Sequence, residues 1–168
     1  MRFVIFRYFG AAGASETYGE YHVAETNIIP DVLKVTLGQK DCVPVYGTDY
    51  PTTDGTRIRD YIHVLDMAKA HIIPLKYPDR LFANKSYNLG NGEGASVFEV
   101  IEAAQRVTGT EITLEYLAKR HGDPPVLVAS EDLARRELNW HPQCSELETI
   151  IASAWQWHQK NQNGYESI

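Results

Sequence analysis

The hydrophobic positions of this chain fall into short runs whose lengths and spacing are typical of β-strands. Residues 1–9 (MRFVIFRYF) and 43–46 (VPVY) are mainly apolar, residues 86–89 (SYNL) precede a glycine-rich loop, and residues 111–117 alternate between apolar and polar side chains. Continuous apolar runs of this length predict buried strands, whereas strict alternation predicts a strand with one exposed face. We therefore expect a buried strand at 1–9, strands at 43–46 and 86–89, and a half-exposed strand at 111–117.

Other segments carry the periodicity and the end signals of helices. Ser96 with Glu99 and Ser145 with Glu148 have the spacing of a capping box, and Ser130 is a candidate N-cap. Pro30 suits a first helical position, and Gly38 suits the residue at which a helix ends, so a further helix is expected between them. The expected helices cover residues 30–38, 64–77 (with a start near 64 or 66), 96–109, 130–137 and 145–160.

Two features test these assignments. Pro74 lies inside the helix expected over 64–77, where it removes a hydrogen bond, so a kink or an early end is expected there. Trp155 and Trp157 are two residues apart and face different sides of a helix, so at least one should pack in the core. Residues 163–168 are expected to form a frayed tail. Loops are expected at 10–24, 48–55 and 90–94, and the whole pattern predicts a single α/β domain over 1–168.

The composition excludes several classes of protein. The net charge of −6 speaks against a general nucleic-acid binder, because binding to a phosphate backbone needs a basic surface. Apolar runs are shorter than the roughly 18 residues of a membrane helix, and residues 1–5 are too short for a signal peptide. Cys42 and Cys144 lie far apart without a metal or disulfide motif. We expect a cytoplasmic protein that does not contact a membrane.

Two motifs have both a functional and a structural interpretation. The loop at 90–94 (GNGEG) joins a strand to a helix, as phosphate-binding loops do, but Ala95 stands where the dinucleotide fingerprint needs its third glycine. A tight turn explains this loop adequately. His63 and His71 are eight residues apart, and no Cys, Asp or Glu completes a set with metal-ligand spacing. We expect no metal site.

Two segments that contain arginine are more informative. TRIRDYIH (56–63) and KRHGD (119–123) each place cationic groups beside Asp in an expected loop. Arginine binds phosphate oxygens bidentately and stays charged in a half-buried site. An adjacent Asp can accept hydrogen bonds from ribose hydroxyls. From composition alone, solvated loops with local ion pairs explain these segments equally well.

The same segments carry a resemblance to a known family. The motifs RYFGAAGA (7–14), ETNIIP (25–30), YGTDYPTTDGTRIRDYIHVLDMAKAH (46–71) and KRHGDP (119–124) resemble the C-terminal half of UDP-glucose 4-epimerases. Those enzymes belong to the extended short-chain dehydrogenase/reductase (SDR) family. The resemblance implies a Rossmann-type fold in which the strands at 1–9 and 86–89 belong to a nucleotide-binding sheet whose other strands lie outside this chain.

The resemblance also implies a ligand, a cofactor and site residues. UDP-hexose is the implied substrate, NAD the cofactor, and a homodimer the assembly. Phe9 is expected near the nicotinamide, and Leu127 is expected where side-chain bulk affects the fit of an N-acetylated sugar. Arg59 and Arg120 are expected to bind the diphosphate and Asp123 the ribose. The remaining expected substrate contacts are Gly10, Asn27, Ile28, Pro44, Val45, Tyr46 and Tyr61, of which Pro44, Val45 and Tyr46 would line a uracil pocket.

Two departures from the family pattern change these expectations. Gly10 stands where the family usually has Asn, so a side-chain amide that contacts the ligand is missing. The family's glycine-rich NAD loop and its Tyr-xxx-Lys pair are expected upstream of this chain; Tyr116 is followed four residues later by Arg120 instead. No catalytic residue is therefore assigned, and the chain alone is expected to be inactive. UDP-xylose and UDP-arabinose 4-epimerases, and a non-enzymatic UDP-sugar-binding remnant, remain alternatives.

Overall fold

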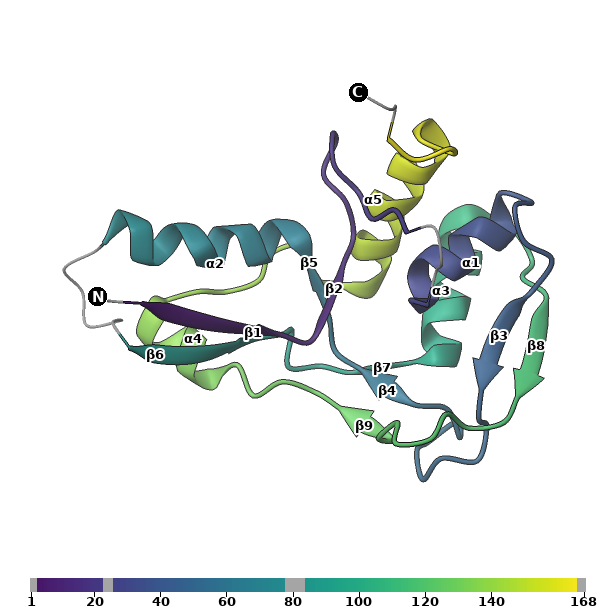
Figure 1. The fold of residues 1–168 in the computed structure, drawn as a ribbon, viewed down its shortest axis with the longest axis horizontal. Helices are drawn as coiled ribbons and strands as arrows, with labels where there is room; N and C mark the ends of the chain where they lie inside the picture. Colours follow the sequence, from purple (N-terminus) through teal and green to yellow (C-terminus); the bar gives the residue numbers. More distant parts are fainter. Residues whose placement is uncertain (1–2, 23–25, 78–83, 166–168) are drawn as a thin grey trace.

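The computed structural model describes residues 3–22, 26–77 and 84–165 of this α/β protein (Figure 1). The α/β class expected from the hydrophobic pattern is confirmed. The strands are β1 (Val4–Tyr8), β2 (Gly10–Ala12), β3 (Val43–Tyr46), β4 (Ile58–Arg59), β5 (Tyr61–His63), β6 (Lys85–Leu89), β7 (Ala95–Ser96), β8 (Leu114–Leu117) and β9 (Val126–Leu127). The helices are α1 (Ile28–Thr36), α2 (Val64–Lys76), α3 (Val97–Thr108), α4 (Asp132–Leu138) and α5 (Leu147–Lys160).

The strands pair in small groups that join distant parts of the sequence. β1 pairs with β6 in parallel, from Val4 opposite Lys85 to Tyr8 opposite Leu89. β2 pairs in parallel with β5, and β3 with β8, while β4 lies between β7 and β9. Parallel pairing requires long connections, which the intervening helices supply. In Figure 1 the β2–β5 pair lies in the middle of the molecule, and the sheet of β7, β4 and β9 lies below it.

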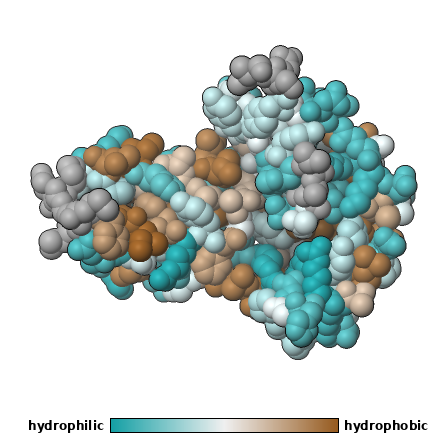
Figure 2. All heavy atoms as spheres, viewed as in Figure 1, coloured by the Kyte–Doolittle hydropathy of each residue, from teal (hydrophilic) through white to brown (hydrophobic). Residues whose placement is uncertain are grey.

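The core is divided into two clusters. The larger packs α1, α3 and α5 against β3, with Val32, Val100 and Ile150 fully buried. The smaller lies between α2, α4 and β6 and contains Tyr87 and Trp140. In Figure 2 the lobe that holds the smaller cluster carries many apolar residues on its surface, whereas the surface of the other lobe is mostly hydrophilic.

The expected helices are present, although their ends differ in part. The capping box of Ser96 and Glu99 is confirmed, and α3 is followed by Gly109 in the left-handed conformation. The other two expected caps are wrong. Ser145 Oγ donates to Asp66 Oδ2 (2.9 Å) instead of capping α5, whose N-cap is Glu146, and Glu131 rather than Ser130 precedes α4. Tertiary hydrogen bonds to a buried carboxylate outweigh the local cap at Ser145.

Three smaller expectations are tested by the structure. Helix α2 continues past Pro74 to Lys76, so of the kink or early end expected at this proline, the early end does not occur. The segment 10–24 contains a short strand, β2, which backbone pairing with β5 imposes on small residues. Within the expected frayed tail, Tyr165 hydrogen-bonds to Gly19. Trp157 is buried, as expected for one of the two tryptophans.

Within residues 3–22, 26–77 and 84–165, no helix has the length and apolar character needed to cross a bilayer. In the same residues no group of three or more His, Cys, Asp or Glu side chains is arranged to hold a metal ion. Cys42 and Cys144 are free thiols.

Candidate functional site

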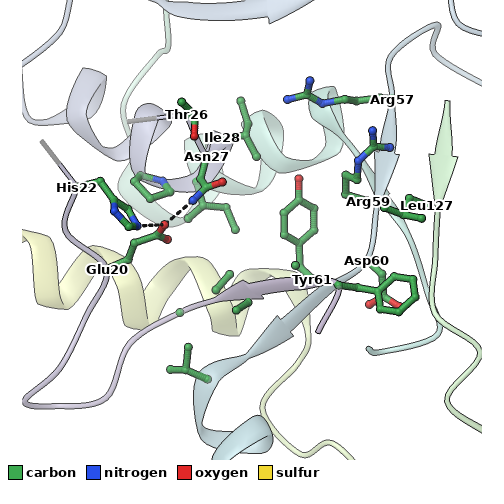
Figure 3. Close-up of a pocket in the computed structure, with 18 of the residues that line it drawn as sticks. Glu20, His22, Thr26, Asn27, Ile28, Arg57, Arg59, Asp60, Tyr61 and Leu127 are labelled. Atoms are coloured by element: carbon green, nitrogen blue, oxygen red, sulfur yellow. Dashed lines mark hydrogen bonds and ion pairs between the residues drawn. The ribbon is translucent and has the colours of Figure 1, made fainter. Parts of the chain in front are cut away.

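A cavity of about 740 Å³ lies where β2, β4 and β5 meet the start of α1. Its floor is the β2–β5 pair, in which Gly10 lies opposite Tyr61. Figure 3 shows Tyr61 standing in the middle, with side chains from different elements on either side. Arg57, Arg59 and Leu127 lie on one side, and Glu20, His22, Thr26 and Asn27 lie on the other.

Two arginines and an aspartate form the cationic end of the cavity. Arg57 and Arg59 are two residues apart along the β4 segment, so their side chains leave the backbone on the same face. Asp123 bridges them, with Oδ2 2.6 Å from Arg57 Nη1 and Oδ1 in contact with Arg59 Nη2. The three side chains are between 14% and 19% exposed, so solvent screens them only in part. The bridge fixes the direction of both guanidinium groups.

Arg120 adds a third guanidinium group to this end. Its Cζ lies 3.8 Å from the centroid of the Tyr46 ring, which is a cation–π contact. Both Arg120 and Asp123 line the cavity. Three guanidinium groups and one carboxylate leave an excess of two positive charges at this end. That charge suits a diphosphate, and the planar guanidinium donors match its oxygens.

Tyr61 occupies the centre and is kept neutral by its surroundings. Burial raises the pKa of its phenol to about 12, despite the nearby positive charges of Arg57 and Arg59. A phenol with this pKa remains protonated near pH 7, so Tyr61 can donate or accept a hydrogen bond but is a poor general base. Phe9 and Gly10 complete the floor beside it.

Asp60 lies beneath the cavity and holds two loops together. Its buried carboxylate accepts hydrogen bonds from the backbone N–H groups of Asn91 (2.7 Å), Gly92 (3.1 Å) and Ala129 (3.0 Å). Burial raises the pKa of Asp60, although these hydrogen bonds act in the opposite direction. The carboxylate therefore ties the glycine-rich loop at 90–94 and the segment after β9 to the β4–β5 turn.

The same contacts decide whether the glycine-rich loop could bind a dinucleotide. Two of its amide groups, at Asn91 and Gly92, already donate to Asp60. A Cβ built on Gly92 would lie 2.4 Å from a carboxylate oxygen of Glu131, so an acidic side chain covers the loop. Occupied donors and an adjacent carboxylate do not fit the pyrophosphate of NAD. The loop is a structural turn.

The opposite wall is formed by a segment between β2 and α1. Asn27 Nδ2 donates to Glu20 Oε1 (2.5 Å), and the same oxygen lies 3.2 Å from His22 Nε2. Dashed lines mark both contacts in Figure 3. Because a carboxylate can only accept, the amide nitrogen of Asn27 is turned toward Glu20. This wall is polar and carries both donors and acceptors.

The structure brings together most of the residues named from the sequence. The nine that line the cavity are Phe9, Gly10, Asn27, Ile28, Arg59, Tyr61, Arg120, Asp123 and Leu127. Pro44, Val45 and Tyr46 on β3 are not among its lining residues; Val45 is fully buried, and Tyr46 reaches the site through its contact with Arg120. Asp123 is already engaged by two arginines, a contact that the sequence did not reveal.

Sequence reasoning missed several residues of the site. Arg57 was not singled out, although its spacing of two from Arg59 is the signal of a shared strand face. Tyr18, Glu20 and His22 also line the cavity. They lie in a segment without periodicity, so only the folded chain reveals their position.

The chain is similar in sequence to known UDP-glucose 4-epimerases. A UDP-glucose 4-epimerase of Halalkalibacterium halodurans is 45% identical over 99% of this chain, and one of Streptococcus mutans is 43% identical over 99% of it. These alignments cover 51% and 50% of the relatives. The chain thus spans about half the length of the curated relatives that it matches.

Solved structures show the same relation. A crystal structure of a UDP-glucose 4-epimerase superposes with a TM-score of 0.94 and 48% identity over 99% of this chain and 51% of that one. The UDP-glucose 4-epimerase of Bifidobacterium longum in complex with NAD+ and UDP superposes with a TM-score of 0.89 and 39% identity, over 96% of this chain and 49% of that one. The extended SDR, Rossmann-type fold is thereby confirmed. The family model for NAD dependent epimerases and dehydratases matches residues 1–90, more than half of the sequence, and the chain therefore belongs to the NAD dependent epimerase/dehydratase family.

Proposed function

We propose that this chain forms the UDP-hexose-binding part of a UDP-glucose 4-epimerase, which interconverts UDP-glucose and UDP-galactose. The observation that carries the proposal is the cationic end of the cavity, where Arg57, Arg59 and Arg120 surround Asp123. The relatives and solved structures described above, which carry that name at 39–48% identity, support it.

In this proposal each part of the cavity takes one part of the ligand. Arg59 and Arg120 bind the diphosphate through charge-assisted hydrogen bonds, and Arg57 adds to their positive field. Asp123 retains lone pairs beyond its two arginine contacts and accepts from a ribose hydroxyl. Phe9, Gly10, Asn27, Ile28, Tyr61 and Leu127 contact the remainder of the ligand. The uracil lies beside Pro44 and Tyr46, next to Arg120, whereas Val45 is fully buried and offers the ligand no surface.

The residues described here bind and orient rather than transform the substrate. The glycine-rich loop does not fit NAD, and Tyr61 is held in its protonated form. NAD supplies the redox chemistry of the family, and Phe9 is the one residue that we assign to its vicinity. We propose that the whole enzyme is a cytoplasmic homodimer and that this chain alone does not convert its ligand.

Competition between nucleotide sugars tests the proposal. Saturation-transfer NMR should show UDP-galactose bound to the chain and displaced by UDP-glucose, because both share the diphosphate and uridine contacts. Galactose 1-phosphate, which lacks the uridine and one phosphate, should displace little. A chain that binds neither UDP-sugar, or binds both without mutual displacement, would rule out a common UDP-hexose site.

A further inference from the structure

One wall of the cavity is fastened to the C-terminal end of the chain. The segment at residues 13–20, here called the cavity loop, follows β2 and contributes Tyr18, Gly19 and Glu20 to the lining. Tyr165 lies more than 140 residues later, and its hydroxyl bonds twice to one residue of this loop. It accepts from Gly19 N (3.0 Å) and donates to Gly19 O (2.6 Å).

Trp157 on α5 provides a second attachment. Its buried indole Nε1–H donates to Thr17 O (3.3 Å), and its ring lies 5.3 Å from that of Tyr165. Gly19 sits directly against the indole: a Cβ at this position would lie 2.2 Å from the ring. The absence of a side chain lets the loop backbone pack flat on Trp157. We refer to Trp157 and Tyr165 together as the C-terminal clasp.

Among the described residues, the cavity loop also carries local hydrogen bonds, including Ser15 N to Tyr18 O (2.8 Å) and Thr17 N to Ser15 Oγ (3.3 Å). Ser15 Oγ accepts from Tyr18 N (2.8 Å), which closes a local turn, and Ala14 N donates to Ser153 Oγ (3.1 Å) on α5. Tyr18 is 70% exposed, so its side chain contributes little packing. A segment with few buried contacts opens easily unless hydrogen bonds hold it.

The position of the loop matters because Glu20 is its last residue. Glu20 accepts from Asn27 Nδ2, and both side chains line the cavity opposite the arginines. A change in the backbone at Gly19 would displace Glu20 and, through it, the amide of Asn27. Small displacements of binding groups reduce affinity because the ligand must then reorder them.

We propose that Tyr165 is a positioning residue for the UDP-hexose site, acting through the C-terminal clasp on the cavity loop. The inference rests on the proposed function, since the ligand that binds against the ordered wall is a UDP-hexose. Tyr165 lies outside the cavity lining and acts through its hydrogen bonds to Gly19 and its ring contact with Trp157. The tail of the chain therefore contributes to ligand affinity from outside the site.

The substitution Tyr165→Phe tests the proposal because it removes the hydroxyl and keeps the ring on Trp157. Tyr116→Phe is the matched control: Tyr116 is 63% exposed on β8, against 51% for Tyr165, and is not in the cavity lining. Hydrogen–deuterium exchange of residues 13–20 should become about two- to tenfold faster in Tyr165→Phe, as expected for hydrogen bonds of ordinary strength. Exchange in α3 should stay unchanged.

Calorimetry with UDP-galactose gives the second measurement. Affinity should fall about two- to tenfold in Tyr165→Phe and stay constant in Tyr116→Phe. Exchange and affinity equal to those of the control would overturn the role of Tyr165. Faster exchange with unchanged affinity would also overturn it, because the clasp would then hold the loop without serving the site. A wild-type chain that does not bind UDP-galactose would contradict the proposed function, whereas the exchange measurement needs no ligand and still judges the clasp.

Discussion

Arg59 and Arg120 both precede Asp123 in the sequence, and their guanidinium groups are held in direction by different means. Arg59 is fixed by the carboxylate of Asp123, and Arg120 by the face of Tyr46. Neither depends on the ligand for its position, so each guanidinium is oriented before binding. Pre-oriented donors convert more of their interaction energy into affinity.

Removing either arginine should therefore weaken UDP binding strongly. A hydrogen bond to a charged group contributes about 1.5–3 kcal/mol, so Arg59→Ala or Arg120→Ala should lower the affinity for UDP roughly ten- to a hundredfold. Arg106→Ala is the control, because Arg106 pairs with Glu148 on the exposed surface. Calorimetry that gives the same dissociation constant for all three variants would refute the assignment.

A substitution at Leu127 tests which sugars the cavity accepts. It is 45% exposed and borders the cavity, so a larger side chain there would occupy space now open to the ligand. Leu127→Tyr should reduce the affinity for UDP-N-acetylglucosamine about tenfold more than the affinity for UDP-glucose. Val126→Tyr, on the neighbouring position of β9, should affect both ligands alike. An equal loss for both ligands in Leu127→Tyr would disprove the role.

Gly10 differs from the family pattern for a reason that the structure supplies. A Cβ at this position would lie 2.5 Å from the carbonyl oxygen of Asp60, so β2 approaches β5 too closely for a side chain. Gly10→Asn should cost about 1–3 kcal/mol of unfolding free energy by forcing the strands apart. Ala11→Asn places the same side chain on an exposed position of β2 and should cost less. Urea denaturation showing equal stability of the two variants would contradict this reading.

At the scale of elements, Asp66 joins α2 to the segment before α5. Its fully buried carboxylate accepts from the backbone N–H groups of Gln143 (2.9 Å) and Cys144 (2.7 Å), and from Ser145 Oγ and Lys69 Nζ. Burial alone would raise the pKa of Asp66, but these hydrogen bonds outweigh burial and hold the pKa below its usual value. The carboxylate is therefore a structural anchor.

Asp66→Asn should destabilise the protein by about 2–4 kcal/mol at pH 7, because an amide cannot accept from every donor around it. The folded-state pKa lies below the unfolded value of about 3.9, so the stabilisation is present above that value and is lost as the pH falls through the folded-state pKa. The difference between wild type and variant should therefore shrink in acid. Urea unfolding at neutral and acidic pH, with the exposed Asp41→Asn as control, measures it; a constant difference would contradict the prediction.

The helices and strands also show which features could be predicted from the sequence and which could not. Local signals located β1, β3, β6 and the helices because hydrophobic periodicity and the capping box at Ser96 act within a few residues. The same reasoning failed at Ser145, where a carboxylate 79 residues away takes the hydroxyl. The residues of the site also divide into those that the sequence predicted and those that depend on distant contacts. The motif of Arg59 and Arg120 was visible, whereas the clasp and the wall at Glu20 depend on contacts across the chain.

At the scale of the whole molecule, the lobe of β1 and α2 presents an apolar surface (Figure 2). Phe3, Ile5 and Tyr8 are 45–48% exposed, and Leu75 on α2 is 79% exposed. In the described part of the chain β1 pairs with β6 alone, which leaves the other edge of β1 unpaired. An exposed apolar edge favours pairing with another chain.

We therefore expect the chain to self-associate in solution. Light scattering should show a mass that rises with concentration, and Ile5→Lys should reduce it by placing a charge on the edge strand. Leu117→Lys alters an exposed apolar residue of β8 and should leave the mass unchanged. A monodisperse monomer that unfolds sharply and reversibly above about 60 °C would show that this apolar surface does not cause self-association.

A calorimetric titration of the chain with UDP-galactose at two salt concentrations tests most directly whether the cavity binds a UDP-hexose. A site built from Arg57, Arg59 and Arg120 predicts one saturable site per chain, with an affinity that falls as salt screens the diphosphate. Binding with that stoichiometry and salt dependence would establish the cavity as the UDP-hexose site. The absence of saturable heat, or an affinity that does not change with salt, would show that the cavity is not a UDP-hexose site.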